Sequence, residues 1–432
     1  MKNSGNNKKR VLLCTGSFNT GAGGVASYAH DFIDAFNAEY QFAVITGDNY
    51  ENASEKYEVT TISTDNYSKK NAIMLLKKIE EYEPDLIINS GHSLMAIVTP
   101  YVDNHIKIIS ISHFTDGRLA WAAGMNGNYV DNIVTLSSFA KKYIISKFDI
   151  CAKDKVSVVY NYMSAAKDLA VQKKKSAQVL KIVYPGGHSF EKSAEVVCLA
   201  INKLLKTKLN FELFWLGSQV LPGAGWPFTV AKTVSDCLNC NDKRIKHIGS
   251  LKREDAQKVL LDANIFLLPS RGEGCPISLI EAMRGGCISI ISDAKHGSLE
   301  IVENQKDGFI VKQGSASDIV RTIDDIIVNH TKYLSMYDYS IEKFKSSLEY
   351  SVWFKKMSNI LQENYNHKKR KKYTNWNFYR DVSRMKLLNV SFWLKDRFFI
   401  QPYQVICFNL LSILFKNKRT LCIANKVQNN SL

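Results

Sequence analysis

Short runs of aliphatic and β-branched residues alternate with longer segments in which apolar residues recur at helical spacing, over most of the chain. This alternation is typical of parallel sheets assembled from strand, helix and strand units. The runs fall into two series, which predict two sheets. Strands are expected at residues 10–15, 42–46, 86–89, 106–111, 133–136 and 156–160 in the first series, and at 181–184, 211–216, 245–248, 264–268, 287–291 and 309–311 in the second.

The two series predict an α/β protein with two doubly wound, Rossmann-like domains. We expect an N-terminal domain over residues 1–165, a polar, lysine-rich linker over 166–178 and a C-terminal domain over 179–339. A helical stretch over 340–367 and a basic, aromatic-rich tail over 368–432 follow. Ligands of doubly wound sheets bind beyond the carboxyl ends of the strands, so the function is expected in the loops that follow strands.

The charge pattern separates the body of the chain from its ends. The 432 residues are 45% hydrophobic and 23% charged, as in ordinary folded proteins, and carry a formal net charge of +16. Residues 368–432 hold 14 Lys and Arg against two Asp, and the first ten residues add four more basic side chains, so residues 11–367 are neutral overall. A neutral body argues against a groove that tracks nucleic acid, and no nucleic-acid partner is expected.

Cysteine usage and hydropathy indicate the compartment. The nine cysteines are scattered and odd in number, which argues against a secreted disulfide framework and favours a reducing environment. Cys237 and Cys240 form a lone CxxC pair, for which no zinc site is predicted. No signal peptide opens the chain, and its longest apolar stretches, such as 405–415, are shorter than the ~20 residues that span a bilayer. We expect a cytoplasmic protein, either soluble or peripheral on the inner face of the cytoplasmic membrane.

The tail allows two interpretations. Val382, Met385, Leu388 and Phe392 recur at helical steps with basic residues between them. Such a pattern suits an anionic membrane surface, where each basic group contributes about 1 kcal/mol. It equally suits a terminal helix that packs on the N-terminal domain with its lysines exposed.

The strongest local signal is the segment Pro-Ser-Arg-Gly-Glu-Gly-Cys-Pro-Ile-Ser-Leu-Ile-Glu-Ala-Met at 269–283. It follows an apolar strand and opens a helix at Pro276, where a missing N–H costs no hydrogen bond. Backbone amides at such a helix start form a natural phosphate site. Glu273 lies in the loop and Glu281 about two turns into the helix, so their carboxylates are expected more than ~8 Å apart. That spacing suits two ends of one ligand better than a retaining hydrolase pair at ~5 Å.

This motif, with seven residues between its two glutamates, resembles that of the retaining glycosyltransferases of family 4 (glycosyl transferases group 1), which have the GT-B fold. The resemblance covers roughly residues 10–365. It implies two Rossmann-like domains facing a central cleft, with the helix over 340–367 returning toward the N-terminal domain. It also implies that Glu273 is catalytic and faces the donor sugar, and that Glu281 binds the ribose hydroxyls of a sugar nucleotide. The other donor-binding residues expected in this segment are Arg271, Gly274, Cys275, Pro276, Ile277 and Ser278.

The segment 185–193 resembles the family's Gly-Arg…Lys-Gly loop, whose Arg and Lys grip the donor diphosphate. Gly186 and Lys192 match, whereas Gly187 stands where the Arg is expected and Ser193 where the second Gly is. One charge-assisted phosphate contact, worth ~1.5–3 kcal/mol, is therefore missing. Arg271 is either a replacement for it or a structural ion-pair partner. The gap motivates an alternative function, a non-catalytic GT-B scaffold that binds a glycan or a partner protein.

The glycine-rich segment 20–25 resembles the family's glycine loop, in which Gly23 and Gly24 would let the backbone approach the phosphate and the acceptor. A second alternative is open for the same residues. Gly21, Gly23 and Ala26, with Asp48 some 22 residues on, also fit the dinucleotide fingerprint of an NAD-dependent oxidoreductase. That fingerprint requires its first glycine at the strand end, whereas residues 16–20 intervene here.

His113 follows a predicted strand at the place where family 4 enzymes carry a cleft histidine near the donor sugar. A purely structural role for His113 is an equally open alternative. His92 and Asp116 are weaker candidates for the acceptor side, and Asn161 begins a segment that resembles the family's hinge and is assigned no chemistry. No Asp-x-Asp occurs in the chain, and the resemblance implies that neither a metal nor another cofactor is needed.

Together these features predict a retaining, metal-independent glycosyltransferase. It would move a hexose or related sugar from a nucleotide-diphosphate sugar to a hydroxyl of a glycan or lipid-linked oligosaccharide. Family analogy and the basic tail point to bacterial surface polysaccharide synthesis, of capsule or lipopolysaccharide.

Overall fold

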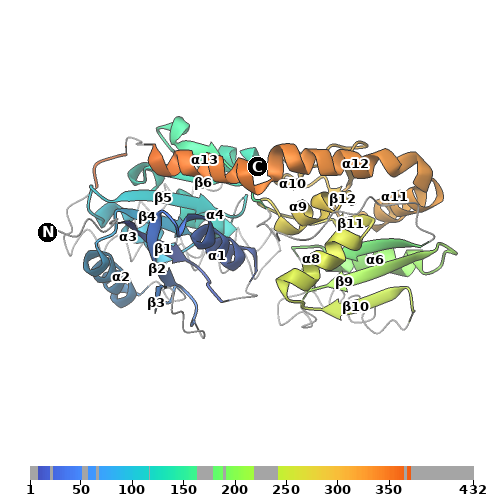
Figure 1. Cartoon of the computed structure of the whole chain (residues 1–432), viewed down its shortest axis with the longest axis horizontal. Helices are drawn as coiled ribbons and strands as arrows, with labels where there is room; N and C mark the ends of the chain where they lie inside the picture. The colour runs from blue at the N-terminus through green and yellow to red at the C-terminus, as the bar shows by residue number, and fades with distance from the viewer. Residues whose placement is uncertain are drawn as a thin grey trace, which may run out of the picture. The chain divides into compact units, whose positions relative to one another are not determined.

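The structure is a computed structural model, drawn as a ribbon in Figure 1, and it describes residues 8–19, 23–50, 57–64, 68–115, 117–162, 179–187, 191–217, 242–363 and 367–370. Contacts divide the chain into two compact units, residues 1–382 and 383–432, and all described residues belong to the first. Several predicted features lie outside the described residues, namely the linker 166–178, Asp116, the pair of Cys237 and Cys240, and the tail beyond residue 370.

The N-terminal sheet is parallel throughout, with the strand order β3-β2-β1-β4-β5-β6-β7. Its strands are β1 (Lys9–Thr15), β2 (Tyr40–Thr46), β3 (Glu58–Thr61), β4 (Leu86–Ser90), β5 (Lys107–Ser112), β6 (Asn132–Thr135) and β7 (Val156–Val158). Leu12 of β1 pairs in register with Ile87 of β4, and both are buried. Central strands of this kind are covered on both faces, which is why they read as nearly continuous apolar runs.

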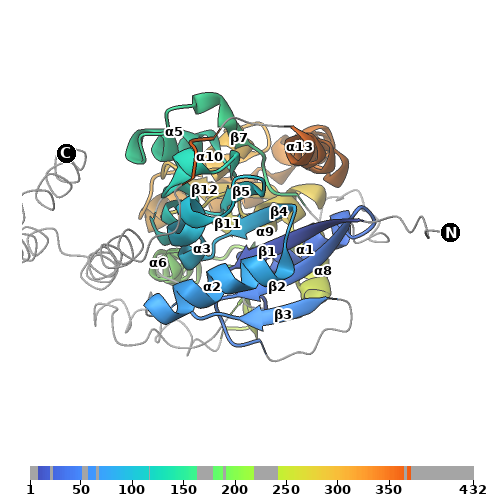
Figure 2. The same ribbon diagram turned by 90° about the vertical axis from the view of Figure 1, so that its left-hand side faces the viewer.

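Helices supply that cover. They are α1 (Gly24–Phe36), α2 (Lys69–Tyr82), α3 (Ser93–Val98), α4 (Gly117–Gly124), α5 (Ser138–Lys147) and α13 (Tyr350–Gln362). Figure 2 shows α1 and α13 on one side of the sheet, with α2 and α3 on the other. Phe32 and Phe36 of α1 lie against Trp353 of α13, with ring centroids 6.2 and 5.8 Å apart. Aromatic packing thus joins a helix from the far end of the described chain to the first domain.

The C-terminal sheet is also parallel, in the order β10-β9-β8-β11-β12-β13. Its strands are β8 (Leu180–Tyr184), β9 (Phe211–Leu216), β10 (Ile245–Gly249), β11 (Ile265–Leu268), β12 (Ile288–Ser292) and β13 (Gly308–Val311). The helices are α6 (Ala194–Leu204), α8 (Arg253–Asp262), α9 (Ile277–Arg284), α10 (Ser298–Ile301), α11 (Ala316–Val328) and α12 (Leu334–Lys343). Helices α6 and α11 contribute to one buried cluster, and α8 and α9 to the other, so this sheet too lies between helices.

Every strand that the sequence predicts is observed, within about two residues at its ends, and the fold class of two doubly wound parallel sheets is confirmed. Strand β3 was not predicted. Its sequence Glu-Val-Thr-Thr contains no apolar run, because it lies at the edge of the sheet and is only partly buried. Short 3-10 turns occur at Thr99–Tyr101, Gly127–Tyr129, Lys153–Lys155 and His330–Tyr333.

The helical stretch expected at 340–367 consists of the end of α12, a π-helical turn at Phe344–Leu348 and α13. Met357 and Ile360 of α13 belong to the core cluster of the N-terminal sheet. Lys107, at the start of β5, donates from Nζ to the carbonyl oxygens of Ile360 at 3.1 Å and Leu361 at 2.9 Å. A cation at the carboxyl end of a helix satisfies its last carbonyl groups and its dipole.

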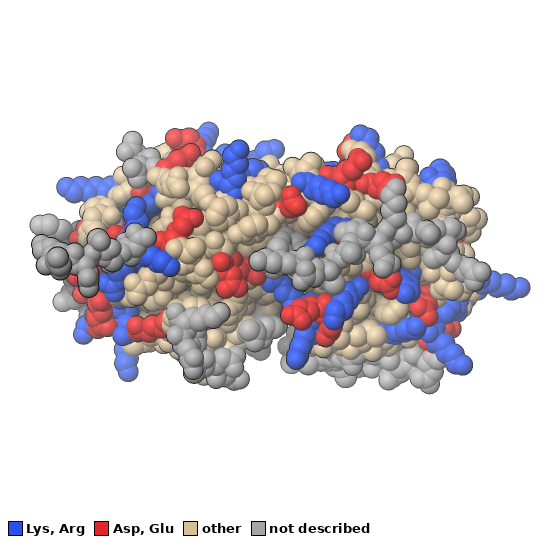
Figure 3. Space-filling model, viewed as in Figure 1, with Lys and Arg blue, Asp and Glu red and all other residues tan. Residues whose placement is uncertain are grey.

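The charged surface reflects the neutral body of the chain. Figure 3 shows acidic and basic side chains interspersed over the face that it draws. Among the described residues, no helix combines the length and the apolar character that crossing a bilayer would require.

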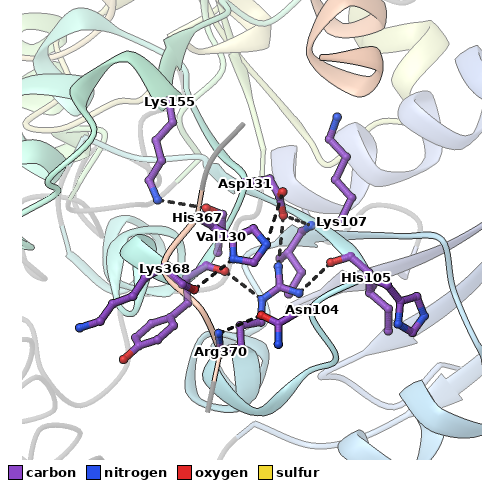
Figure 4. A network of polar contacts seen from close by, with 12 residues as sticks. Asn104, His105, Lys107, Val130, Asp131, Lys155, His367, Lys368 and Arg370 are labelled. Carbon is purple, nitrogen blue, oxygen red and sulfur yellow. Dashed lines mark hydrogen bonds and ion pairs between the residues drawn. The ribbon is translucent and has the colours of Figure 1, made fainter. Parts of the chain in front are cut away.

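The start of the basic run 368–372 is fastened to the N-terminal domain (Figure 4). The side chain of Arg370 is completely buried and donates to the carbonyl oxygens of Asp103 at 2.6 Å, Ile106 at 2.7 Å and Tyr129 at 3.0 Å. Its Nη2 also donates to Asp131 Oδ2 at 3.1 Å. The planar guanidinium with its five donors suits such a set of acceptors, which an ammonium could not match. This arginine is therefore structural, whereas a basic run in a sequence predicts solvent exposure.

Replacing Arg370 by alanine should lower the free energy of unfolding by roughly 3 kcal/mol or more, because Asp131 would stay buried without its cation. Arg370→Lys should fall between the wild type and Arg370→Ala. The exposed neighbour Lys369, changed to alanine, serves as the matched control and should leave stability unchanged. The midpoint of urea unfolding gives the comparison, and equal midpoints for all three variants would contradict the anchoring role.

Candidate active site

The strand order of each sheet reverses at one point, and ligands of doubly wound sheets bind beside such points. In the C-terminal sheet the reversal lies between β8 and β11. The loop after β8 carries Lys192 and the loop after β11 carries Glu273. The fold therefore brings these two predicted site residues together, although 81 positions separate them in the sequence.

Glu273 is buried, with 4% of the residue exposed, and its charge is met by neighbouring side chains. Its Oε1 accepts hydrogen bonds from Lys192 Nζ at 2.5 Å and from Ser270 Oγ at 2.8 Å. Ser270 is held in turn, because Ser292 Oγ donates to its carbonyl oxygen at 2.5 Å. An ionised carboxylate without a partner is costly to bury, so the ammonium of Lys192 stabilises the charged form of Glu273 at this position.

The loop that carries Glu273 is in direct contact with the loop after β5 of the N-terminal sheet. Thr115 Oγ1 donates to the carbonyl oxygen of Glu273 at 2.7 Å. At Gly274 the backbones are so close that a Cβ would overlap the carbonyl oxygen of His113. Asn161 strengthens the contact, since its Nδ2 donates to the carbonyl oxygen of Cys275 at 2.6 Å. Only glycine fits at position 274.

His113 is buried on the N-terminal side of this contact. Its Nε2 lies 2.7 Å from Ser90 Oγ at the end of β4, and its ring meets the ring of Tyr28 edge-on at 4.9 Å. Burial lowers the pKa of His113 to about 4, so the imidazole is neutral at physiological pH. It can exchange a hydrogen bond with a ligand but brings no positive charge to the site.

Glu281 lies on α9 and is also buried, with 6% exposed. Its Oε1 accepts from Gln257 Nε2 at 2.8 Å and lies 3.9 Å from Arg253 Nε. Burial raises the pKa of Glu281, and the hydrogen bond from Gln257 and the charge of Arg253 oppose that rise. Arg253 Nη1 also donates to Asp31 Oδ1 on α1 at 2.8 Å, so it connects Glu281 with the N-terminal domain.

The loop after β8 places its expected residues as follows. Gly186 lies against the Tyr184 hydroxyl, which donates to the carbonyl oxygen of Lys192 at 3.1 Å. Gly187, where the family arginine is expected, has a φ of 53° and donates from its N–H to the carbonyl oxygen of Leu216 at 2.8 Å. A guanidinium is thus replaced here by tightly packed backbone.

The guanidinium of Arg271 is bound to side chains at and just after the end of the loop that follows β8. Its Nη2 forms an ion pair with Glu195, and its Nη1 donates to Ser193 Oγ at 3.2 Å. Of the two roles weighed for Arg271, these contacts favour the structural ion pair. Lys192 is then the basic residue of this loop that faces the Glu273 carboxylate.

Two helix starts carry the remaining predicted donor-binding residues that the structure describes. Pro276 is the N-cap of α9, and the amides of Ile277 and Ser278 belong to its first turn, where N–H groups have no partner within the helix. Gly23 is the N-cap of α1, and open space surrounds the Cβ positions of both Gly23 and Gly24. Among the described residues, no group of three or more His, Cys, Asp or Glu side chains is placed to hold a metal ion.

Two protein-family models match the chain. The model of Glycosyltransferase Family 4 matches residues 22–165, and the model of Glycosyl transferases group 1 matches residues 167–343. The chain belongs to the family 4 glycosyltransferases. The resemblance and the expectation of a glycosyltransferase enzyme are thereby confirmed. The NAD-dependent oxidoreductase alternative is set aside, because Gly23 and Asp48 lie inside the matched family region.

Curated relatives and solved structures agree with this family. An uncharacterised glycosyltransferase of Haemophilus influenzae is 26% identical over 301 residues, which are 66% of this chain and 80% of that protein. A lipopolysaccharide 1,6-galactosyltransferase of Escherichia coli is 24% identical over 296 residues, covering 65% and 76% respectively. The crystal structure of HepE from Anabaena in complex with UDP-glucose superposes with a TM-score of 0.65 at 15% identity, covering 82% of this chain and 99% of that one. The GT-B fold of this glycosyltransferase is confirmed.

The structure adds residues that sequence reasoning did not single out. Ser90 and Thr115 reach His113 and the Glu273 loop, and both stand at or just after strand ends, where ligand loops are expected. Asn161, which was assigned no chemistry, holds the segment after Glu273. Arg253 and Asp31 lie on helices and come together only in the folded glycosyltransferase, so no local pattern marks them.

Gly274→Ala should destabilise the glycosyltransferase, since the added methyl group overlaps the backbone of His113 and must push the two loops apart. Gly24→Ala is the matched control, because a Cβ there meets nothing within 4 Å. We expect a lower melting temperature for Gly274→Ala and an unchanged or slightly higher one for Gly24→Ala. Similar melting temperatures for the two variants would contradict the close contact.

His113 should make stability depend on acid. In the unfolded chain its imidazole takes up a proton near pH 6.5, whereas the folded protein resists protonation until about pH 4. Its contribution is therefore complete above pH 6.5 and is lost as the pH falls toward 4, by up to about 1.4 kcal/mol per pH unit. Urea unfolding of wild type and His113→Gln at pH 7 and pH 4.5 measures this. The variant should lose less stability between the two pH values, and parallel losses would refute the assignment.

Proposed function

We propose that this glycosyltransferase is a retaining, metal-independent enzyme that transfers a hexose from a UDP-sugar to a hydroxyl of a cell-surface saccharide. The observation that carries the proposal is the ion pair between the buried carboxylate of Glu273 and the partly exposed ammonium of Lys192, which joins the two loops at the switch point, next to the start of α9. The nucleotide is taken from the UDP-glucose of the HepE complex, and the saccharide class from the lipopolysaccharide galactosyltransferase.

The positive side of the site suits a departing diphosphate. Lys192 and the backbone amides at the start of α9 would stabilise the charge that develops on the leaving phosphate, which is the main electrostatic task in such a transfer. These groups supply positive potential from the chain itself, and this is why we propose catalysis without a metal or another cofactor. Because Gly187 replaces the arginine, diphosphate binding should depend strongly on Lys192.

The acidic side of the site suits the sugar. Glu273 would accept hydrogen bonds from donor hydroxyls and orient the anomeric carbon once Lys192 turns to the phosphate. The bond from that carbon to the diphosphate oxygen breaks, the acceptor oxygen bonds to the same face, and the acceptor proton passes to the leaving phosphate. Front-side displacement of this kind retains the anomeric configuration. His113, neutral and held by Ser90, would offer a hydrogen bond near the sugar.

Nucleotide selection falls to the other end of the site. Glu281 would accept hydrogen bonds from both ribose hydroxyls, which its carboxylate geometry allows. An acceptor attached to a lipid would bring the enzyme to a membrane, and we propose that the basic tail 368–432 assists there by binding anionic lipid headgroups. The exposed Lys368 and Lys369 open that tail beside the anchored Arg370.

Glu273→Gln should lower the rate of transfer by roughly 100-fold or more without lowering the melting temperature, because the amide keeps the shape but loses the charge. The assay follows UDP release from UDP-glucose, UDP-galactose and their N-acetylated forms, with a lipopolysaccharide acceptor. Glu303→Gln is the control and should leave the rate unchanged, because Glu303 lies at the surface and forms an ion pair with Lys306.

An active Glu273→Gln variant would refute the role given to this carboxylate. A wild-type protein that neither binds nor turns over any sugar nucleotide would favour the non-catalytic scaffold instead.

A further inference from the structure

The amino end of α5 in the N-terminal domain is capped by a carboxylate from the C-terminal domain. Glu300 on α10 accepts from the backbone N–H of Ser138 through Oε2 at 2.8 Å and from that of Phe139 through Oε1 at 2.9 Å. The two oxygens thus bind two successive N–H groups at the start of one helix. About 160 residues separate the partners in sequence.

This cap completes the hydrogen bonding of the helix start. The N–H of Ala140 donates to Ser137 Oγ at 3.1 Å, and the N–H of Lys141 donates to the carbonyl oxygen of Ser137 at 3.0 Å. The N–H groups of Ser138 and Phe139 have no acceptor within α5, so Glu300 is what satisfies them. The negative charge also lies at the positive end of the helix dipole.

Tyr160 adds a third bond to the same carboxylate. Its hydroxyl donates to Glu300 Oε2 at 3.0 Å, and Tyr160 lies one residue before Asn161, which holds Cys275. Burial raises the pKa of Tyr160 to about 12, with the nearby charge of Glu300 as a further cause, so the hydroxyl keeps its proton as a donor. Charge-assisted hydrogen bonds of this type are stronger than neutral ones.

The segment before Glu300 reaches the loop of Glu273. The N–H of Gly297 donates to the carbonyl oxygen of Glu273 at 3.4 Å. A Cβ at Gly297 would overlap the carbonyl oxygen of Gly274 and lie 3.2 Å from Ser137 Cβ. Gly297 is therefore enclosed between the Glu273 loop and the residue that precedes α5. Three residues after Gly297, Glu300 fastens the same segment to α5 through its hydrogen bonds, and we call this contact the Glu300 clamp.

We propose that Glu300 is a positioning residue that holds the N-terminal domain against the Glu273 loop, so that the donor sugar is enclosed and passed to the acceptor rather than to water. The proposal rests on the proposed function. With Glu300 removed, the N–H groups of α5 are left to water and the contact between the domains loosens. Glu300 touches neither donor nor acceptor in this account, and it acts through Gly297 and α5.

Four variants of the full chain test this. Glu300→Ala removes the cap, Glu300→Gln keeps one accepting oxygen but loses the charge, and Tyr160→Phe removes only the third bond. Glu303→Ala is the matched control, because Glu303 is a nearby acidic residue whose partners are Lys306 and Tyr339 of its own domain.

Hydrogen–deuterium exchange tests the clamp without any substrate. Glu300→Ala should speed exchange in peptides that contain residues 138–139 and also in those that contain 272–276, whereas Glu303→Ala should leave both unchanged. Exchange that rises in neither region, or only in the peptide of α5, would overturn the proposal, because no link to the Glu273 loop would remain.

Enzyme kinetics separate positioning from a simple loss of stability. With UDP-sugar and acceptor, Glu300→Ala should lower kcat for transfer by roughly tenfold or more, change KM for the donor far less, and raise the ratio of donor hydrolysis to transfer. Glu300→Gln and Tyr160→Phe should give values of kcat and of this ratio between those of the wild type and Glu300→Ala, with the larger effect in Glu300→Gln. An unchanged ratio of hydrolysis to transfer in an active Glu300→Ala protein would refute the proposal while leaving the transferase function intact. A wild-type protein without activity would refute that function. The exchange data would still show whether Glu300 holds α5 and the Glu273 loop together.

Discussion

The candidate site depends on one close approach, the contact of the Glu273 loop with the loop after β5. The absence of a side chain at Gly274 lets its backbone meet the carbonyl of His113, and Thr115 and Asn161 fasten the backbone on either side. Both loops follow the carboxyl ends of parallel strands, which is where doubly wound sheets bind their ligands. The contact therefore brings the predicted site residues of two separate sheets close together.

Under the proposed function, the charges of the candidate site would meet a ligand with a negative end and a hydroxyl-rich end. Lys192 is paired with Glu273, and a phosphate could take over this cation while sugar hydroxyls take over the carboxylate. Burial raises the pKa of Glu281, and the hydrogen bond from Gln257 and the charge of Arg253 offset only part of that rise. Buried charges of this kind cost stability, and they are expected where function demands them.

The strands and the main candidate site residues could be predicted from the sequence. The strands could be predicted because buried parallel strands consist of apolar runs, and Glu273, Glu281 and Lys192 could be singled out as candidates because their motifs are local. Arg370 was not understood, since its acceptors at Asp103, Tyr129 and Asp131 are more than 230 positions away. Glu300 could not be recognised for the same reason, because its partners at the start of α5 are about 160 positions away in the sequence. Local patterns reveal elements and motifs, whereas contacts between distant segments appear only in three dimensions.

We propose that Lys192 and the start of α9 bind the diphosphate of a nucleotide donor although Gly187 replaces the family arginine. Isothermal titration calorimetry of the full chain with UDP and with uridine tests it most directly, because the two ligands differ only in the diphosphate. We expect one site that binds UDP at least roughly tenfold more tightly than uridine, as one charge-assisted contact would give. Equal affinities for the two ligands, or no binding of UDP, would contradict it.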